Sequence, residues 1–193
     1  MSGHAPIPYT TEPRADTGVS NVTMGFWLFI ASEVMLFGAL FSSYALLRVS
    51  AEDWPVGREV LHLGLGSINT MVLVWVLVLM SRTRRARVGH YRPLVLAASA
   101  LALVFLAMKG FEYRTEWVEG VRPATNTFFA MYFTLTGLHA LHVVGGLIAN
   151  MWILAGASSV GEAMTRGRLQ AVTRYWAFVD LVWLTIFVGL YLL

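Results

Sequence analysis

The sequence predicts an all-α membrane protein, a bundle of five transmembrane helices. Of the 193 residues, 57% are hydrophobic and only 13% are charged, which is unlike an ordinary soluble domain. Five long apolar segments occur, and a helix needs roughly 20 mostly apolar residues to cross a hydrocarbon core about 30 Å thick. The basic residues lie mainly in the short connections between these segments. These observations together place the chain in the membrane class.

The five predicted spans follow a short polar tail. Residues 1–21 are rich in turn-forming residues, and no basic stretch precedes the first apolar segment, so we expect a short disordered or surface-lying tail and no signal peptide. A basic block, SRTRRARVGHYR, separates the second span from the third, and GASSVGEAMTRGRLQ separates the fourth from the fifth. The spans form one domain of residues 22–193 and comprise residues 22–47, 60–80, 93–110, 127–154 and 173–193.

The loop charges predict the orientation of the chain, because lysine and arginine near the ends of spans are retained on the cytoplasmic side. With a cytoplasmic N-terminus, nine of the 14 basic residues fall on that side and five fall on the other. Acidic residues further dilute the positive charge of the second side. We therefore expect a cytoplasmic N-terminus and a periplasmic C-terminus.

The composition excludes several classes of function. The chain has no cysteine, so disulfides, thiolate metal sites and cysteine nucleophiles are ruled out. The net charge is only +3, and the arginines are not gathered on a soluble face, so no nucleic-acid partner is expected. No phosphate-binding glycine loop or serine nucleophile motif occurs outside the spans. We therefore assign no catalytic residue to this chain.

Four ionisable residues lie deep within the predicted spans. A charge at the bilayer centre costs on the order of 3 kcal/mol, so each such group needs a partner or a use. With a helical rise of about 1.5 Å per residue, all four fall in the cytoplasmic half of the membrane. The sequence therefore predicts one or two buried polar contacts among Glu33, His139, His142 and Asp180.

Two interpretations of these four residues remain open. In the first, they only hold neighbouring helices together, and each side chain is satisfied by another span. In the second, Glu33 exchanges protons or supports a neighbouring proton path, because loss of water favours the neutral form of a carboxyl group. The two interpretations differ in whether Glu33 affects turnover as well as assembly.

The histidine pair also invites a metal or haem interpretation. His139 and His142 share one helix face, so they cannot supply both axial ligands of one haem, and we expect no metal in this chain. Two further polar residues are assigned to the interfaces between helices or between protein and water. Glu112, beside Lys109 at the outer end of the third span, is interpreted as a snorkelling interfacial charge. Asn69, near the middle of the second span, is interpreted as a polar contact between helices.

Five segments read together resemble subunit III of the haem-copper oxygen reductases. The resemblance covers essentially the whole chain from Gly25 onward, and its specificity lies in the combination and order of the segments. They are GFWLFIASEVMLFGALFSSY in the first span, SINTMVLV in the second, GFEY after the third, YFTLTGLHALHVVGG in the fourth and YWAFVDLVWLTIFVGLYLL in the fifth.

The resemblance implies a five-helix bacterial form of an accessory subunit in the inner membrane. In this family, subunit III carries no haem or copper, packs against the catalytic subunit I, sustains proton uptake there and protects that centre during turnover. It implies a proton-pumping terminal oxidase that reduces oxygen to water with electrons from cytochrome c or quinol. Subunit I, subunit II and further respiratory subunits would be partners, haem and copper would reside in them, and phospholipid would be a bound ligand. The family's polar residues correspond to Glu33, His139, His142 and Asp180.

The sequence departs from the family pattern at Ala177, where a histidine commonly follows the Tyr-Trp pair of the last span. The two leading helices of the longer, seven-helix form, which help to make a lipid-filled cleft, have no counterpart in these 193 residues. Three alternative functions stay open on the sequence. They are an accessory subunit of a nitric oxide reductase, a stand-alone proton or solute transporter built around Glu33, and a membrane cytochrome.

Overall fold

The computed structural model describes residues 18–86, 90–156 and 162–193. Within these ranges the regular elements are all helices, which confirms the all-α fold class. Five of the helices are long and apolar enough to cross a membrane, as predicted. Most of the expected tail, part of the basic block and part of the last loop lie outside the described residues. The elements are α1 (Asn21–Ser50), α2 (Gly57–Val60), α3 (Leu63–Thr83), α4 (Arg92–Val118), α5 (Thr127–Ala155), α6 (Glu162–Phe187) and a terminal π-helical turn, η2 (Val188–Leu192).

Two helices extend well beyond the predicted spans. Helix α4 continues to Val118 instead of ending near residue 110, and α6 begins at Glu162 instead of residue 173. The predictions stopped where polar residues begin, because hydropathy marks the hydrocarbon layer of the membrane. The helices continue beyond that layer because their backbone hydrogen bonds do not depend on apolar side chains. The short helix α2 was not predicted.

Local sequence explains where several helices begin and end. Before α1, the Ser20 hydroxyl accepts a hydrogen bond from the backbone N–H of Thr23 at 3.2 Å. Before α5, the side-chain oxygen of Asn126 accepts one from the N–H of Phe129 at 2.9 Å. Both are N-caps that satisfy an otherwise unpaired backbone donor. Helix α4 is followed by Gly120, whose φ of 83° lies in the left-handed region that favours glycine and commonly ends a helix.

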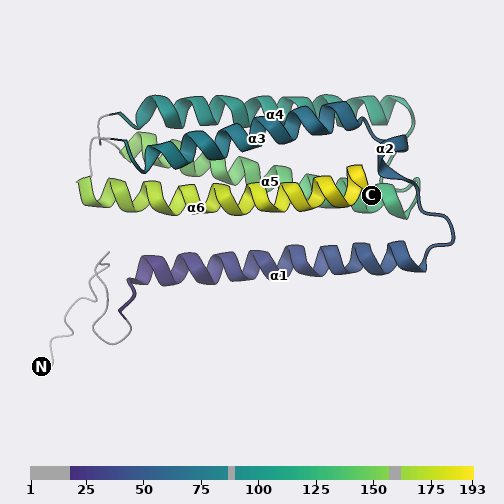
Figure 1. Cartoon of the computed structure of the whole chain (residues 1–193), viewed down its shortest axis with the longest axis horizontal. Coiled ribbons are helices and arrows are strands. Elements are labelled where there is room, and N and C mark those ends of the chain that lie inside the picture. Colours follow the sequence, from purple (N-terminus) through teal and green to yellow (C-terminus); the bar gives the residue numbers. More distant parts are fainter. Residues whose placement is uncertain (1–17, 87–89, 157–161) are drawn as a thin grey trace, which may run out of the picture.

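The long helices lie roughly parallel and antiparallel along one axis, so the molecule has two distinct ends (Figure 1). The beginnings of α1, α4 and α6 and the end of α3 share one end of the bundle, which we call the arginine-rich end because Arg82, Arg84 and Arg85 close α3 there. Helix α2 and η2 lie at the opposite end, which we call the α2 end.

Helices α3 to α6 form the compact part of the bundle, and α1 lies along one side of it against α5 and α6 (Figure 1). Only 6% of the most apolar stretch of α1 is buried within the chain, compared with 44% for α6. The interior is filled by large aromatic side chains, among which Trp176, Trp183 and Tyr132 are almost completely buried. Most of α1 is therefore exposed to lipid or to another protein.

Candidate functional site

The side chains of Glu33 and His142 connect α1 to α5. Oε2 of Glu33 lies 2.8 Å from Nε2 of His142. On the other side of the imidazole ring, Nδ1 lies 2.8 Å from the backbone carbonyl oxygen of Leu138, one turn earlier in α5. The two side chains are only 15% and 13% exposed, so the contact is mostly buried but lies near the edge of the bundle.

The position of the proton in this contact follows from the partner of Nδ1. A carbonyl oxygen can only accept, so Nδ1 of His142 must carry the hydrogen of the bond to Leu138. One proton then lies between Nε2 and Glu33, either on a neutral carboxyl group or on a charged imidazole ring. Removing this proton would leave two acceptors facing each other, and adding another would leave an unbalanced positive charge. The pair is therefore suited to hold one proton.

Aromatic side chains from α1 and α6 surround the pair. The ring of Phe37 in α1 meets the His142 ring edge-on at 5.1 Å between centroids and also contacts Phe178 of α6 at 6.3 Å. The hydroxyl of Tyr175 in α6 donates to the backbone carbonyl of His142 at 2.8 Å. Helices α1, α5 and α6 therefore meet at this point. The aromatic surroundings exclude water, and a hydrogen bond is electrostatically stronger in such a medium than in water.

His139 and Asp180, predicted to belong to the same group, lie elsewhere. The His139 ring is fully buried between Phe105 of α4 and Trp183 of α6, at 5.5 and 5.0 Å between ring centroids. Residues three apart on a helix point about 60° away from each other, so His139 faces α4 and α6 whereas His142 faces α1. Among the described residues, neither His139 nor Asp180 has a hydrogen-bond partner for its side chain.

Potential metal ligands do not gather at one point in the described part of the bundle. No group of three or more histidine, aspartate or glutamate side chains lies close enough to hold a metal ion within the described ranges. Both ring nitrogens of His142 already face an oxygen atom, so a metal at this ring would have to displace Leu138 or Glu33.

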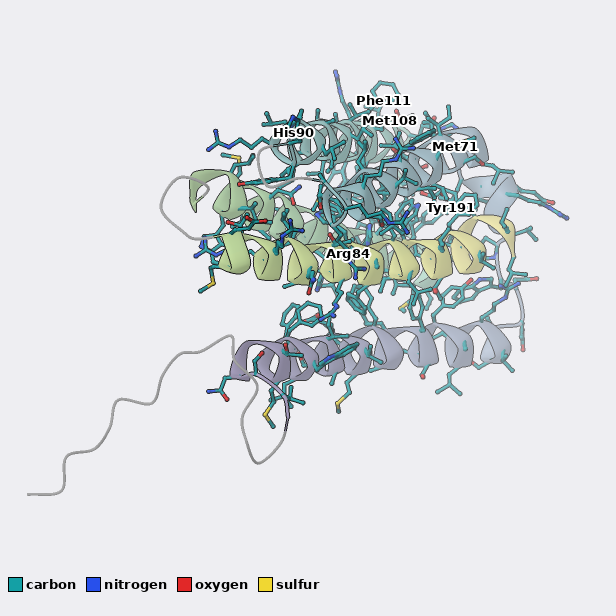
Figure 2. All side chains as sticks on the ribbon, turned by 60° about the vertical axis from the view of Figure 1, so that its left-hand side comes forward. Met71, Arg84, His90, Met108, Phe111 and Tyr191 are labelled. Atoms are coloured by element: carbon teal, nitrogen blue, oxygen red, sulfur yellow. The ribbon has the colours of Figure 1, made fainter. Side chains whose placement is uncertain are left out.

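A second buried polar cluster lies toward the α2 end, and the sequence interpretation missed most of it. Nζ of Lys109 is 3.0 Å from Oε2 of Glu112 and 2.9 Å from the hydroxyl of Tyr191. The hydroxyls of Tyr132 and Tyr191 donate to Oε1 of Glu112 at 2.8 and 2.5 Å. Figure 2 shows Tyr191 near the end of α6. Helices α4 and α5 and turn η2 thus share one cluster, formed by Lys109, Glu112, Tyr132 and Tyr191.

The interpretation of Glu112 as a snorkelling interfacial charge is wrong, because its carboxyl group is completely buried and bonded on both oxygens. The error came from ending the third span near residue 110. The signal that could have corrected it is the spacing of Lys109 and Glu112, which places opposite charges on one helix face. Asn69 is also fully buried, but its amide has no hydrogen-bond partner among the described residues, so the expected polar contact between helices is not present there.

Comparison with known proteins gives a consistent result. A family model described as cytochrome c oxidase subunit III matches residues 14–193. A cytochrome bo(3) ubiquinol oxidase subunit 3 from Pseudomonas aeruginosa is 28% identical over 184 residues, which cover 92% of this chain and 87% of the relative. A cytochrome c oxidase subunit 3 from a Bacillus species is 28% identical over 199 residues, covering 97% and 93% of the two chains. A protein from Aeropyrum pernix named heme-copper oxidase subunit I+III is 31% identical over 187 residues, covering 89% of this chain and 23% of that protein.

Proposed function

Because the chain belongs to the cytochrome c oxidase subunit III family, we propose that its Glu33–His142 pair supports proton uptake by the catalytic subunit of a haem-copper terminal oxidase. The chain is an accessory subunit of such an oxidase and a multi-pass protein of the bacterial inner membrane. It associates with other oxidase subunits.

The contact between Glu33 and His142 is the observation that carries the proposal. It links two helices across 109 positions of sequence, and its geometry accommodates one proton between the two side chains. A pair with only a packing role would not require a titratable group at both positions. The partial exposure of both side chains places the pair at the edge of the bundle, where another subunit of the oxidase could contact it.

The catalytic subunit that the pair supports is subunit I in this proposal. Subunit I would contact the present chain directly. The relative from Aeropyrum pernix carries both subunit designations in one polypeptide, which is consistent with a direct contact between them. We place haem and copper in subunits I and II, where oxygen would be reduced to water, and we include bound phospholipid as a ligand of the complex. The relatives are subunits of quinol oxidases and of cytochrome c oxidases, so the proposal covers both electron donors.

The same proposal assigns an orientation. The arginine-rich end contains Arg82, Arg84 and Arg85, so it faces the cytoplasm under the rule that basic residues are retained inside. Glu33 would then lie closer to the cytoplasmic surface, from which an oxidase takes up protons. Residues 22–193 act as one membrane domain in this proposal. The relatives do not favour a nitric oxide reductase subunit or a stand-alone transporter.

Replacing Glu33 by glutamine and by alanine distinguishes proton support from packing. In Glu33→Gln the side-chain amide can donate to Nε2 of His142, so the hydrogen bond persists without a titratable proton. We expect this variant to assemble normally but to lose activity several-fold faster during sustained turnover, with slower proton uptake in reconstituted vesicles. Glu33→Ala should impair both assembly and sustained turnover.

The control is Glu59→Gln, which removes an exposed carboxylate in α2, outside the spans. It should behave like the unsubstituted complex in all measurements. If Glu33→Gln also retains normal assembly, proton uptake and catalytic lifetime, the pair serves only to hold α1 against α5 and the proposal is wrong.

A further inference from the structure

Three aromatic rings from three helices contact one another near the middle of α4 and α5. The ring centroids of Phe105 in α4 and Trp183 in α6 lie 4.9 Å apart, and the His139 ring of α5 lies 5.5 and 5.0 Å from them. The indole N–H of Trp183 donates to the hydroxyl of Thr70 in α3 at 3.0 Å, which fixes the tryptophan ring. All three rings are almost completely buried. We call Phe105, His139 and Trp183 the ring layer.

The ring layer separates two sets of ionisable side chains. Toward the arginine-rich end, the Glu33–His142 pair lies one turn along α5 from His139. Toward the α2 end, Nζ of Lys109 lies 5.6 Å from the centroid of the Trp183 ring and pairs with Glu112. His139 is close enough to both His142 and Lys109 to interact with each of them electrostatically. It therefore lies between the two sets.

The second set extends to the surface of the α2 end. Glu116 follows Glu112 by one helix turn on α4 and is only 2% exposed. It interacts electrostatically with His62 and Glu119, both of which are exposed. Rows of acidic and histidine side chains carry protons through membrane proteins. Such a row runs along this bundle from the α2 end to the Glu33–His142 pair, and the ring layer lies within it.

We propose that the ring layer is a proton barrier, which keeps the proton of the Glu33–His142 pair from exchanging with the set of groups at the α2 end. Phe105 and Trp183 cover His139 with aromatic carbon, and an apolar constriction of this kind excludes water. Within the described residues, the ring of His139 has no hydrogen-bond partner that could pass a proton to it. The barrier rests on the proposed function, in which the pair takes part in proton uptake. An unbroken row would let protons return across the membrane and waste the gradient that respiration builds.

Trp183 is the residue whose removal should open the barrier. Trp183→Ala would leave a cavity bounded by Thr70, Lys109 and His139, all of which are contacts of the indole ring. A cavity with two to four polar partners holds water, whereas an apolar cavity stays dry. Water in this cavity would join His139 to Lys109. On the other side, His142 is one helix turn from His139, with about 5–6 Å between the Cβ atoms.

A simpler explanation is that the three rings only fill the interior. Trp176 supplies the matched control, because it lies on the same helix two turns earlier and is fully buried. Its indole N–H donates to Asn150 at 3.2 Å, and its ring packs against Gly146. Trp176→Ala therefore removes the same ring at a place outside the row of ionisable groups. A packing role predicts the same proton permeability for both tryptophan variants, whereas a barrier predicts that only Trp183→Ala conducts protons.

The experiment uses the purified oxidase complex in vesicles that contain a pH-sensitive dye. Proton entry is driven by a potassium diffusion potential with valinomycin, in the absence of an electron donor. We expect Trp183→Ala to raise the passive proton permeability several-fold, and Trp176→Ala to leave it unchanged. Adding His139→Leu to Trp183→Ala should remove the leak, because leucine cannot carry a proton. Equal permeability of the two tryptophan variants, or a leak that persists with His139→Leu, would overturn the proposal.

A measurement on the unsubstituted complex tests the barrier even if a tryptophan variant fails to assemble. The C2 hydrogen of a histidine ring exchanges slowly with deuterium from water, and mass spectrometry of peptides gives its rate. We expect His139 to exchange several-fold more slowly than the exposed His62. Equal rates would show that water reaches the ring layer, and the proposal would be wrong. Neither measurement involves turnover, so a failure of the barrier is distinguishable from a failure of the proposed function, which Glu33→Gln tests during turnover.

Discussion

Nζ of Lys109 lies 3.0 Å from Oε2 of Glu112, and both side chains are buried inside the helix bundle. The two residues are three positions apart on α4, so one helix supplies both charges. The tyrosine hydroxyls of Tyr132 and Tyr191 complete the hydrogen bonding of the carboxylate. The lysine also lies 4.8 Å from the centroid of the Tyr132 ring, a favourable cation–π distance. This cluster therefore ties α4, α5 and the end of the chain together through fully satisfied charges.

Separating the charges of this cluster should strongly destabilise the subunit. Lys109→Met leaves Glu112 without its counter-ion, and Glu112→Leu does the same to Lys109, so each should lower stability by about 3–5 kcal/mol. The double substitution should lower stability by less than either single one, because no unpaired charge remains. The temperature at which the purified oxidase complex releases this subunit measures the order of the three variants.

The exposed pair Arg166–Glu162 on α6 provides the control, since its side chains are 49% and 62% exposed. Arg166→Gln should change stability by less than about 1 kcal/mol. The interpretation of the buried cluster as a charge pair would be wrong if the double substitution at Lys109 and Glu112 were as damaging as the worse single one.

Gly57 should not tolerate a side chain. A Cβ atom at this position would overlap the backbone oxygen of Leu190, so Gly57→Ala must push α2 away from η2. We expect a loss of about 1–3 kcal/mol, the usual range for overpacking. Gly64→Ala is the matched control, because a Cβ atom there would meet no other atom within 4 Å and the greater helix propensity of alanine should raise stability by up to about 1 kcal/mol. Unfolding of the two variants is followed by titration with a denaturing detergent. Equal unfolding midpoints would show that α2 can move away from η2 without a cost in stability.

Glu33 and His142 should be energetically coupled. In a double-mutant cycle with Glu33→Ala and His142→Ala, we expect a coupling of about 0.5–3 kcal/mol, since the side chains share a hydrogen bond. Tyr44 lies on the same helix but bonds to the carbonyl of Gly189, so Tyr44→Phe and His142→Ala should be additive within about 0.5 kcal/mol. The rates of backbone hydrogen exchange along α1 in the intact complex measure the change in local stability for every variant of both cycles. Additivity in the first cycle would mean that the contact does not hold α1 in place.

Removing the carboxyl group of Asp180 should not weaken the isolated fold. Both oxygens are buried and lack a hydrogen-bond partner among the described residues, so they lose hydration without compensation. Asp180→Leu should therefore be neutral or stabilising by about 1–3 kcal/mol. Thermal denaturation of the purified subunit in detergent tests this, with Val179→Ala as a neighbouring buried substitution that should destabilise. A marked loss of stability in Asp180→Leu would show that the carboxyl group has a partner after all.

The five spans could be predicted from the sequence because a hydrocarbon layer demands a continuous apolar segment, and such segments are easily recognised. The boundaries could not be predicted as well. Helix α4 continues to Val118 through polar residues, and α6 starts at Glu162 within a segment read as loop. At these places the helix is stabilised by backbone hydrogen bonds and contacts with its neighbours, which hydropathy does not record.

The depth of a residue could be calculated from the sequence, but its direction could not. Glu33 and His142 were placed at similar depth, and the structure brings them into contact. His139 and Asp180 were placed in the same layer and instead face other parts of the bundle, because the rotation of each helix depends on how its neighbours pack. For the same reason, nothing local to Tyr191 indicates that its hydroxyl reaches Glu112 on α4.

The placement of Lys109 and Glu112 on one helix also bears on how the chain enters the membrane. Helices are released into the bilayer as they are synthesised, so α4 is present before the segments that supply Tyr132 and Tyr191. Since Lys109 and Glu112 are within pairing distance on α4 itself, the helix can enter with little net charge and without waiting for a partner. The hydroxyl of Tyr132 in α5 reaches the Glu112 carboxylate next, and the hydroxyl of Tyr191 in η2 reaches it last. The order of translation therefore matches the order in which this cluster is completed.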